Sequence, residues 1–250
     1  MTDPFESRET CSTRLAWLNR FRDTVVDLLF PPRCVACHRV GAWLCSNCMA
    51  GAQIIQPPIC GRCGLPLGAS GPSHTCRLVA PLDRLLACAF HSGPIREAIH
   101  EFKYQDLRAL AVPLGRLMAQ GWIQLAGSCD PPEILVPVPL HAARQQQRGY
   151  NQSALLAREL AKALQRPLVE NLLTRAKATR PQVDLDFLQR RANVLDAFRC
   201  PAGAFDGTSV LLVDDVCTTG STLAAASEAL KAAGASSVLA YTLARAQAPS

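Results

Sequence analysis

The stretch that decides the fold is LLVDDVCTTGSTL, residues 211–223. An apolar run, Val210–Val213, has the composition of a central parallel strand and leads into two acids. A hydroxyl-rich loop then opens an alanine-rich helix over Thr222–Ala233, and a further strand is expected at Ser237–Leu243. Strands alternating with helices in this way predict an α/β fold with a parallel sheet.

The loop between the strand and the helix has the chemistry of a phosphate site. A helix N-terminus offers unpaired N–H groups and a partial positive charge. Gly220 lets the backbone approach a ligand closely or adopt a positive φ. Side-chain hydroxyls can add hydrogen bonds to a bound phosphate, and they belong to Thr218, Thr219, Ser221 and Thr222.

The adjacent acids Asp214 and Asp215 narrow the ligand class. Two carboxylates would repel a bare phosphate, but they accept hydrogen bonds from the 2′- and 3′-hydroxyls of a ribose. The segment therefore predicts a site for a ribose 5-phosphate, with the acids on the diol and the loop on the phosphate. A hydroxyl-rich helix cap after an acidic turn is the alternative interpretation.

The chain upstream of this segment also follows an α/β pattern. One helix is expected to begin at Pro94 and to bury Ile95, Ala98, Ile99 and Phe102. A second helical period covers Leu107–Gln124, where Pro113 should kink or break the helix. The remaining expected elements are strands at Leu85–His91 and Ile134–Pro139 and a helix at Ser153–Leu164.

A basic loop is expected after the Ile134–Pro139 strand, before a helix that begins near Asn151. It carries Arg144 and Arg148, and arginine is suited to bidentate contact with phosphate. This loop is either a second anion subsite or a solvated basic surface. The mild basic excess of the whole chain, a formal net charge of +6, suits a phosphate-bearing ligand and permits nucleic-acid binding.

Twelve cysteines are many for this chain, whose first ten residues lack the basic and apolar regions of a signal peptide and which has no uncharged apolar run long enough to span a membrane. We expect a cytoplasmic protein, in which clustered cysteines are read first as metal ligands. Bound zinc should then stabilise a Pro- and Gly-rich region at 31–80. This region is expected to follow a helical lead-in at 1–30 and to precede an α/β domain at 84–246.

Three Cys-x-x-Cys pairs specify the zinc sites. The first site should be a structural tetrahedral one, made by Cys34, Cys37, Cys45 and Cys48. The second has the pair Cys60 and Cys63, for which His74 and Cys76 are the candidate partners. This second site is either a Cys3His zinc site or a weakened, empty one.

The residue 211–223 segment closely resembles the signature of type I phosphoribosyltransferases, which bind phosphoribosyl pyrophosphate (PRPP). The resemblance implies that Asp214 and Asp215 hold the ribose at the catalytic centre and that residues Thr218–Thr222 hold its 5′-phosphate. It also implies that Arg144 and Arg148 contact the pyrophosphate and that Mg²⁺ accompanies PRPP. Cys217 occupies a variable position, as a tolerated small residue or as an oxidisable thiol with a lowered pKa.

Three blocks and the cysteine pairs together resemble the ComF family, over roughly residues 30–245. The blocks are VPVPLHAARQQQRGYNQS, RAKATRPQVDLDFLQRRANV and VDDVCTTGST. Family members usually have a further Cys-x-x-Cys pair where this chain has Ser73-His74-Thr75-Cys76. In the second block, Lys177, Arg180, Arg190 and Arg191 could form a cover over the site, a nucleic-acid surface or a solvated face.

The ComF resemblance implies a role in competence-associated DNA uptake and leaves three functions open. The first is a phosphoribosyltransferase, a glycosyltransferase that acts on PRPP. The second is a non-catalytic factor that binds single-stranded DNA or a protein of the uptake or recombination machinery. The third is a regulator that senses PRPP or a nucleotide. Aromatic residues make up only 6% of the chain, which lowers the expected affinity for single strands.

Overall fold

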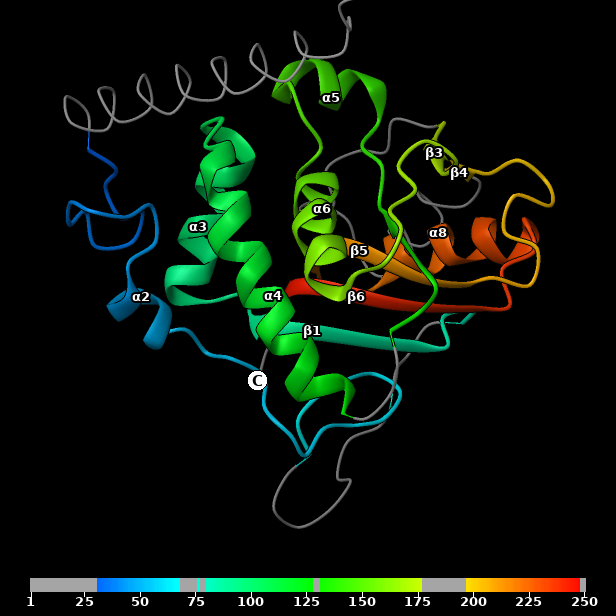
Figure 1. The fold of residues 1–250 in the computed structure, drawn as a ribbon, viewed down its shortest axis with the longest axis horizontal. Coiled ribbons are helices and arrows are strands. Elements are labelled where there is room, and N and C mark those ends of the chain that lie inside the picture. The colour runs from blue at the N-terminus through cyan, green and yellow to red at the C-terminus, as the bar shows by residue number, and fades with distance from the viewer. Residues whose placement is uncertain (1–30, 68–75, 77–79, 128–130, 177–196, 248–250) are drawn as a thin grey trace, which may run out of the picture.

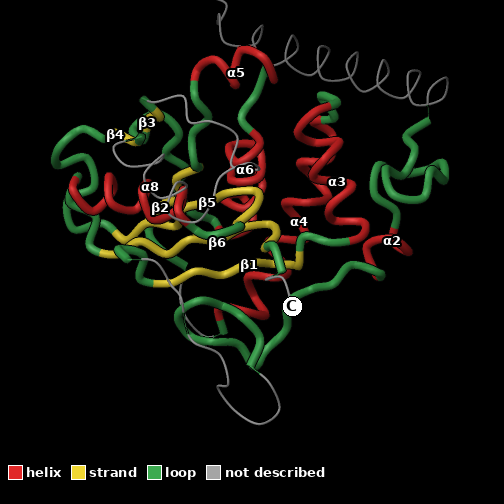
Figure 2. Tube along the Cα trace, turned by 180° about the vertical axis from the view of Figure 1, so that it is seen from behind, coloured by secondary structure: helices red, strands yellow, loops and turns green. Residues whose placement is uncertain are grey.

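The structure is a computed structural model that describes residues 31–67, 76, 80–127, 131–176 and 197–247. Its centre is a four-stranded parallel sheet in the order β1-β6-β5-β2 (Figures 1 and 2). The strands are β1 (Arg84–Phe90), β2 (Ile134–Pro137), β5 (Ser209–Cys217) and β6 (Ser237–Arg245). The α/β prediction with a parallel sheet is therefore confirmed.

Helices cover both faces of this sheet. The sheet therefore separates the apolar core into two layers. On one face, α4 (Ala111–Ala126) packs against α6 (Gln152–Leu164) and β1, and α3 (Gly93–Tyr104) joins the same apolar cluster. On the other face, α8 (Ser221–Ala232) packs against β5 and β6. The predicted apolar face of α3 is buried as expected, with Ile95, Ala98, Ile99 and Phe102 inside.

Two helix predictions need correction. Pro113 neither kinks nor breaks its helix, because it lies in the first turn of α4, where a missing N–H leaves no hydrogen bond unmade. A 3-10 turn at Arg108–Leu110 precedes that helix. The basic loop after β2 is instead a short helix, α5 (Ala142–Arg148), which stands beyond the sheet at the top of Figure 1. The side chain of His141 caps it by accepting a hydrogen bond from the Ala143 N–H.

The acids also lie differently from the prediction. The apolar run does not end before them: β5 continues through Asp214 and Asp215 to Cys217, paired with β6 along this part. Because side chains alternate along a strand, the neighbouring acids project to different sides of the sheet plane. Beyond this strand, α8 runs from Ser221 to Ala232. Gly234 follows the end of the helix with φ 101°, as predicted for a residue that ends a helix.

The cysteine-rich segment packs against the edge strand β1 and against α3. The Ile55 N–H donates to the Cys88 carbonyl over 2.9 Å, and the Phe90 N–H donates to the Gln53 carbonyl over 2.8 Å. A short helix, α2 (Ser46–Ala50), lies beside α3 (Figure 2). The buried side chains of Cys34, Leu44 and Ile55 belong to the same apolar cluster as α3 and α4. The division at residues 80–84 stays a prediction, and the lead-in at 1–30 lies outside the described residues.

A small antiparallel pair lies at the edge of the molecule, made by β3 (Thr174–Arg175) and β4 (Phe198–Arg199). The basic residues Lys177, Arg180, Arg190 and Arg191 fall between these strands, outside the described residues. Within the described part of the chain, no helix combines the length and the apolar character needed to cross a bilayer.

Gly121 sets how closely α4 approaches the sheet. A Cβ at this position would lie 2.7 Å from the Cys88 Sγ and 2.8 Å from the Tyr241 Oη. We expect Gly121→Ala to lower the free energy of unfolding by about 1–3 kcal/mol, because overpacking outweighs the gain in helix propensity. Urea unfolding measures the difference. Gly51→Ala is the control, since its Cβ would meet only atoms at 3.6 Å, and equal effects of the two variants would contradict the expectation.

Candidate functional site

The first cysteine cluster has the geometry of a tetrahedral metal site. The sulfurs of Cys34, Cys37, Cys45 and Cys48 all lie within 4.8 Å of one another, and those of Cys37 and Cys45 are 3.6 Å apart. Four sulfurs around zinc at about 2.3 Å would be about 3.8 Å apart, so the residues present fit this ion. Four protein ligands leave no open position, so zinc here would be structural.

Backbone N–H groups stabilise the ionised form of Cys34. Burial alone would raise the pKa of this thiol, but N–H groups of Cys45, Cys37 and Ala36 outweigh burial and lower the pKa to about 6. The Cys45 N–H lies 3.4 Å from the Cys34 Sγ. A thiolate held in this way is the form that binds a metal.

The second cluster is described in part. The sulfurs of Cys60, Cys63 and Cys76 lie within 4.8 Å of one another. Hydrogen bonds from the N–H groups of Cys63 and Arg62 lower the pKa of Cys60 to about 6. Three of the four predicted ligands are thus brought together. The fourth, His74, lies outside the described residues, so its part in this site stays a prediction.

The hydroxyl-rich loop makes the turn between β5 and α8. Gly220 takes φ 82° immediately before the helix, which explains the need for glycine there. The hydroxyls of Thr219 and Ser221 are 2.9 Å apart, and the Thr219 Oγ1 also accepts from the Ser221 N–H. Thr218 and Thr222 line the adjacent cavity, whereas Thr219, Gly220 and Ser221 shape the turn.

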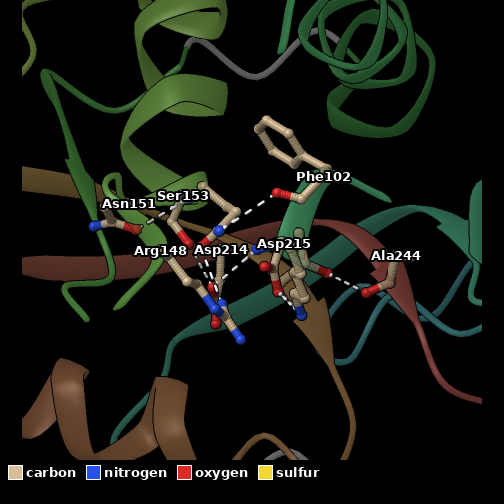
Figure 3. A network of polar contacts seen from close by, with 10 residues as sticks. Phe102, Arg148, Asn151, Ser153, Asp214, Asp215 and Ala244 are labelled. Carbon is tan, nitrogen blue, oxygen red and sulfur yellow. Dashed lines mark hydrogen bonds and ion pairs between the residues drawn. The ribbon is translucent and has the colours of Figure 1, made fainter. Parts of the chain in front are cut away.

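The two acids have different environments at the floor of this cavity. Asp214 accepts hydrogen bonds from the Ser153 hydroxyl over 2.7 Å and from the Asp215 N–H over 2.9 Å (Figure 3). Burial raises the pKa of Asp214 to about 7, and the charge of Asp215 adds to this effect. Asp215 instead forms an ion pair with Lys103 of α3, with 2.8 Å between Nζ and Oδ1.

A single cavity of about 680 Å³ collects these groups. Its wall includes Asp214 and Asp215 from β5, Thr218 and Thr222 from the loop region, and the two predicted arginines of α5. Of those arginines, Arg148 donates to the Gln152 Oε1 over 3.1 Å and lies against the Tyr104 ring. Asn151, near which a helix start was predicted, caps α6, and its Oδ1 accepts a hydrogen bond from the Ser153 N–H over 3.1 Å.

Comparison with known proteins adds family membership to this geometry. Residues 25–79 match the double zinc ribbon domain, and residues 151–249 match the phosphoribosyl transferase domain. The chain is 34% identical to "Competence protein F" of Haemophilus influenzae, over 86% of this chain and 97% of that protein. It is 33% identical to "DNA utilization protein YhgH" of Salmonella typhi, over 87% of this chain and 99% of that protein.

The chain belongs to the ComF family. Among solved structures it is similar to a purine phosphoribosyltransferase from Pyrococcus horikoshii, with 17% identity and a TM-score of 0.31. That alignment covers 54% of this chain and 81% of the other, and its TM-score is too low to bear on function.

One wall of the cavity in this ComF protein was not predicted from the sequence. It comes from α3 and the end of β1, and β3 adds Arg175. The α3 residues recur every three or four positions on the polar face, a spacing that could have marked them as one stripe. The unpredicted lining residues with polar side chains are His91, Arg96, His100, Lys103, Tyr104, Asp106, Gln147, Ser153 and Arg175.

The interpretation of Cys217 as a reactive thiol is wrong. The side chain is buried, and burial raises its pKa to about 11. It therefore packs as a small apolar residue at the end of β5, the other interpretation offered by its variable position in the signature.

Proposed function

We propose that the cavity binds PRPP and transfers its phosphoribosyl group to an acceptor, in a protein that serves competence-associated DNA uptake. The observation that supports this most directly is the shared cavity. Two carboxylates, a threonine-rich helix start and two arginines surround it, as a ribose, a 5′-phosphate and a pyrophosphate would require. The names of the Haemophilus and Salmonella relatives support the cellular role.

The proposed binding mode assigns one group of PRPP to each wall. Asp214 and Asp215 would accept hydrogen bonds from the ribose hydroxyls, with Ser153 fixing the Asp214 carboxylate. The 5′-phosphate would lie at the start of α8, beside Thr218 and Thr222. Arg144 and Arg148 would contact the pyrophosphate from α5. Mg²⁺ would enter with PRPP, and its preferred oxygen donors are the phosphates and these carboxylates.

The corresponding reaction is a displacement at the anomeric carbon. A nucleophilic nitrogen of the acceptor forms a bond to C1, and the C1–O bond to pyrophosphate breaks. The electron pair of that bond leaves on pyrophosphate, and the proton of the acceptor nitrogen passes to solvent. The residues on the cavity wall would act by positioning both reactants and by stabilising the negative charge on the leaving pyrophosphate. Bound Mg²⁺ would supply further neutralisation of that charge.

The acids argue against a nucleic-acid strand in the cavity. Inside a strand the 3′-oxygen is esterified to phosphate, and a phosphodiester next to Asp214 and Asp215 would be repelled. A free diol carries no such charge. If DNA contributes to the function of this protein, we therefore expect it to bind outside the cavity and to leave PRPP affinity unchanged.

Calorimetric titration with PRPP and Mg²⁺ tests the ligand assignment. We expect the double variant Asp214→Asn/Asp215→Asn to bind at least about 100-fold more weakly than the unaltered protein, because two charge-assisted hydrogen bonds are lost. Asp206→Asn is the matched control, since Asp206 is an exposed acid that does not line the cavity. A protein that binds no PRPP would refute the assignment. Binding without pyrophosphate release towards any acceptor would favour the non-catalytic or sensing function.

Transformation assays test the cellular role separately. A deletion strain of the parent organism should take up DNA at a frequency at least about tenfold lower, and the unaltered gene should restore it. The Asp214→Asn/Asp215→Asn gene shows whether the cavity is needed. Restoration by that gene would detach the uptake role from PRPP. A single-stranded oligonucleotide titrated at rising salt, with and without PRPP, tests where DNA binds.

A further inference from the structure

The polar face of α3 forms a continuous basic and aromatic stripe along the cavity. It consists of Arg96, His100, Lys103 and Tyr104, and we call it the α3 stripe. The opposite face of the helix is buried against the core through residues such as Ile95 and Phe102. The helix is therefore held firmly while it presents these four side chains to the ligand space. None of the four is needed to explain the binding of PRPP described above.

The α3 stripe lies close to where the anomeric carbon of PRPP would react. The Lys103 Nζ lies 2.8 Å from the Asp215 Oδ1, so the stripe begins directly beside the carboxylates assigned to the ribose diol. At the next residue of the stripe, the guanidinium of Arg148 lies over the Tyr104 ring, 5.1 Å from the ring centre. A molecule bound on the stripe would thus lie between the ribose position and α5, next to the anomeric carbon.

The charge of the stripe specifies what such a molecule carries. The described cavity lining holds five Arg and Lys side chains and three acids. Arg144 and Arg148 are assigned to pyrophosphate and Lys103 pairs with Asp215, but among the described residues no acid pairs with Arg96. Burial lowers the pKa of His91 nearby, and the positive charges of Lys103 and Arg96 act in the same direction. A third anionic group, beyond the phosphates of PRPP, would be stabilised there.

The aromatic part of the stripe specifies shape. The Tyr104 side chain is 62% exposed, and the centres of the His100 and Tyr104 rings are 5.1 Å apart. An exposed ring beside an imidazole and a guanidinium offers a stacking surface to a planar ligand. The charged side chains of the stripe donate hydrogen bonds, and the nearby acid Asp106 pairs with Arg108 over 2.8 Å. An amino-substituted neutral base would therefore find few acceptors.

We propose that the α3 stripe is the acceptor subsite and that the acceptor is a planar compound bearing a carboxylate or a comparable anionic group. This proposal rests on the proposed function, because it supplies the second reactant for the same cavity. Tyr104 and His100 stack on the ring, and Arg96 binds the anionic group. Lys103 holds the junction between acceptor and ribose through Asp215.

Matched probe pairs that differ only in a carboxylate test this subsite. Orotate is compared with uracil, and nicotinate with pyridine, by calorimetry in the presence of saturating ribose 5-phosphate and pyrophosphate, so that no transfer occurs. We expect the acid of each pair to bind at least about tenfold more tightly than its neutral partner, as a bidentate arginine contact would give. Equal binding within both pairs, or no binding of any of the four probes, would overturn the proposal.

Variants locate the preference on α3. Arg96→Gln should remove the preference for the acid while changing ribose 5-phosphate affinity less than about twofold. Tyr104→Ala should weaken both members of a pair to the same extent, because stacking does not depend on the carboxylate. Val112→Ala, on the exposed side of α4, is the control and should change neither quantity. An unchanged preference in Arg96→Gln would place the anion elsewhere, whereas absent ribose 5-phosphate binding would overturn the proposed function itself.

Discussion

Cys34→Ser/Cys37→Ser is expected to release one equivalent of zinc and to lower the free energy of unfolding by at least about 3 kcal/mol, or about 10 °C in Tm. Two of the four ligands of the first cluster are lost, and Cys34 is fully buried within the main apolar core. Cys34 and its neighbours also line a second cavity that reaches Glu101 in the last turn of α3 and Leu107 just beyond that helix. The loss should therefore extend beyond the zinc region into the packing of α3.

The same variant should bind PRPP more weakly, because a displaced α3 would move Lys103 away from Asp215, one of the two acids proposed to bind the ribose. Atomic absorption gives the zinc content, thermal unfolding the stability and calorimetry the affinity. Cys200→Ser is the matched control, because the Cys200 thiol belongs to neither described cluster. This variant should keep the zinc content, the stability and the PRPP affinity of the unaltered protein. Full zinc content in Cys34→Ser/Cys37→Ser would show that the first cluster is not a metal site.

Asp214→Asn is expected to make the protein more stable at pH 8 by about 1–3 kcal/mol and to have little effect near pH 4. The folded-state pKa of Asp214 is about 7, against 3.8 for the unperturbed group, mainly because of burial. The folded protein therefore keeps a proton that the unfolded chain releases between about pH 4 and pH 7. Stability falls as pH rises through this window, because the unfolded state then binds fewer protons than the folded state.

The size of this effect follows from the same shift. Each pKa unit corresponds to about 1.4 kcal/mol, and some of the shift is offset when Asn changes the hydrogen bonds around it. The Asn oxygen can still accept from the Ser153 hydroxyl, as the Asp214 oxygen does. Urea unfolding at pH 4 and pH 8 measures the difference, with Asp206→Asn as the control. An equal gain in the free energy of unfolding at both pH values would show that the gain has a cause other than the ionisation of Asp214.

The two acids thus illustrate a cost that a binding site can impose on its own fold. An ionised Asp214 beside Asp215 destabilises the empty protein at neutral pH, and Lys103 compensates only one of the two charges. Proteins commonly retain such groups where a ligand uses them, and lose stability in exchange for function. A variant that is more stable but does not bind PRPP would show both effects at once.

The sequence predicted the parts of the site whose geometry is local. The residues that make the β5–α8 turn are contiguous, and the first cluster lies within residues 34–48, so spacing alone placed them. The Lys103–Asp215 ion pair was missed because its partners lie 112 positions apart in the chain. Only the order of strands in the sheet brings α3 over the end of β5, and no local pattern encodes that order.

Two errors came from reading residue types without their positions. A proline breaks a helix only when it lies beyond the first turn of that helix. The sequence did not show that α4 begins at Ala111, which places Pro113 in the first turn. The segment AARQQQR has no apolar periodicity, because α5 buries none of its residues. A helix that buries none of its residues leaves no apolar stripe in the sequence, so the basic residues of α5 were assigned to a loop.

The position of β6 has a consequence for how the protein is made. This strand is the last of the sheet in sequence, yet it lies between β1 and β5 and pairs with both. During synthesis on the ribosome, the edge of β1 that pairs with β6 therefore stays unpaired until residues 237–245 have emerged. Arg245 then donates to the Cys63 carbonyl, joining the second cysteine cluster to the completed sheet. Nascent chains stopped before residue 237 should remain protease-sensitive, because the sheet that carries the cavity is completed only once β6 has emerged.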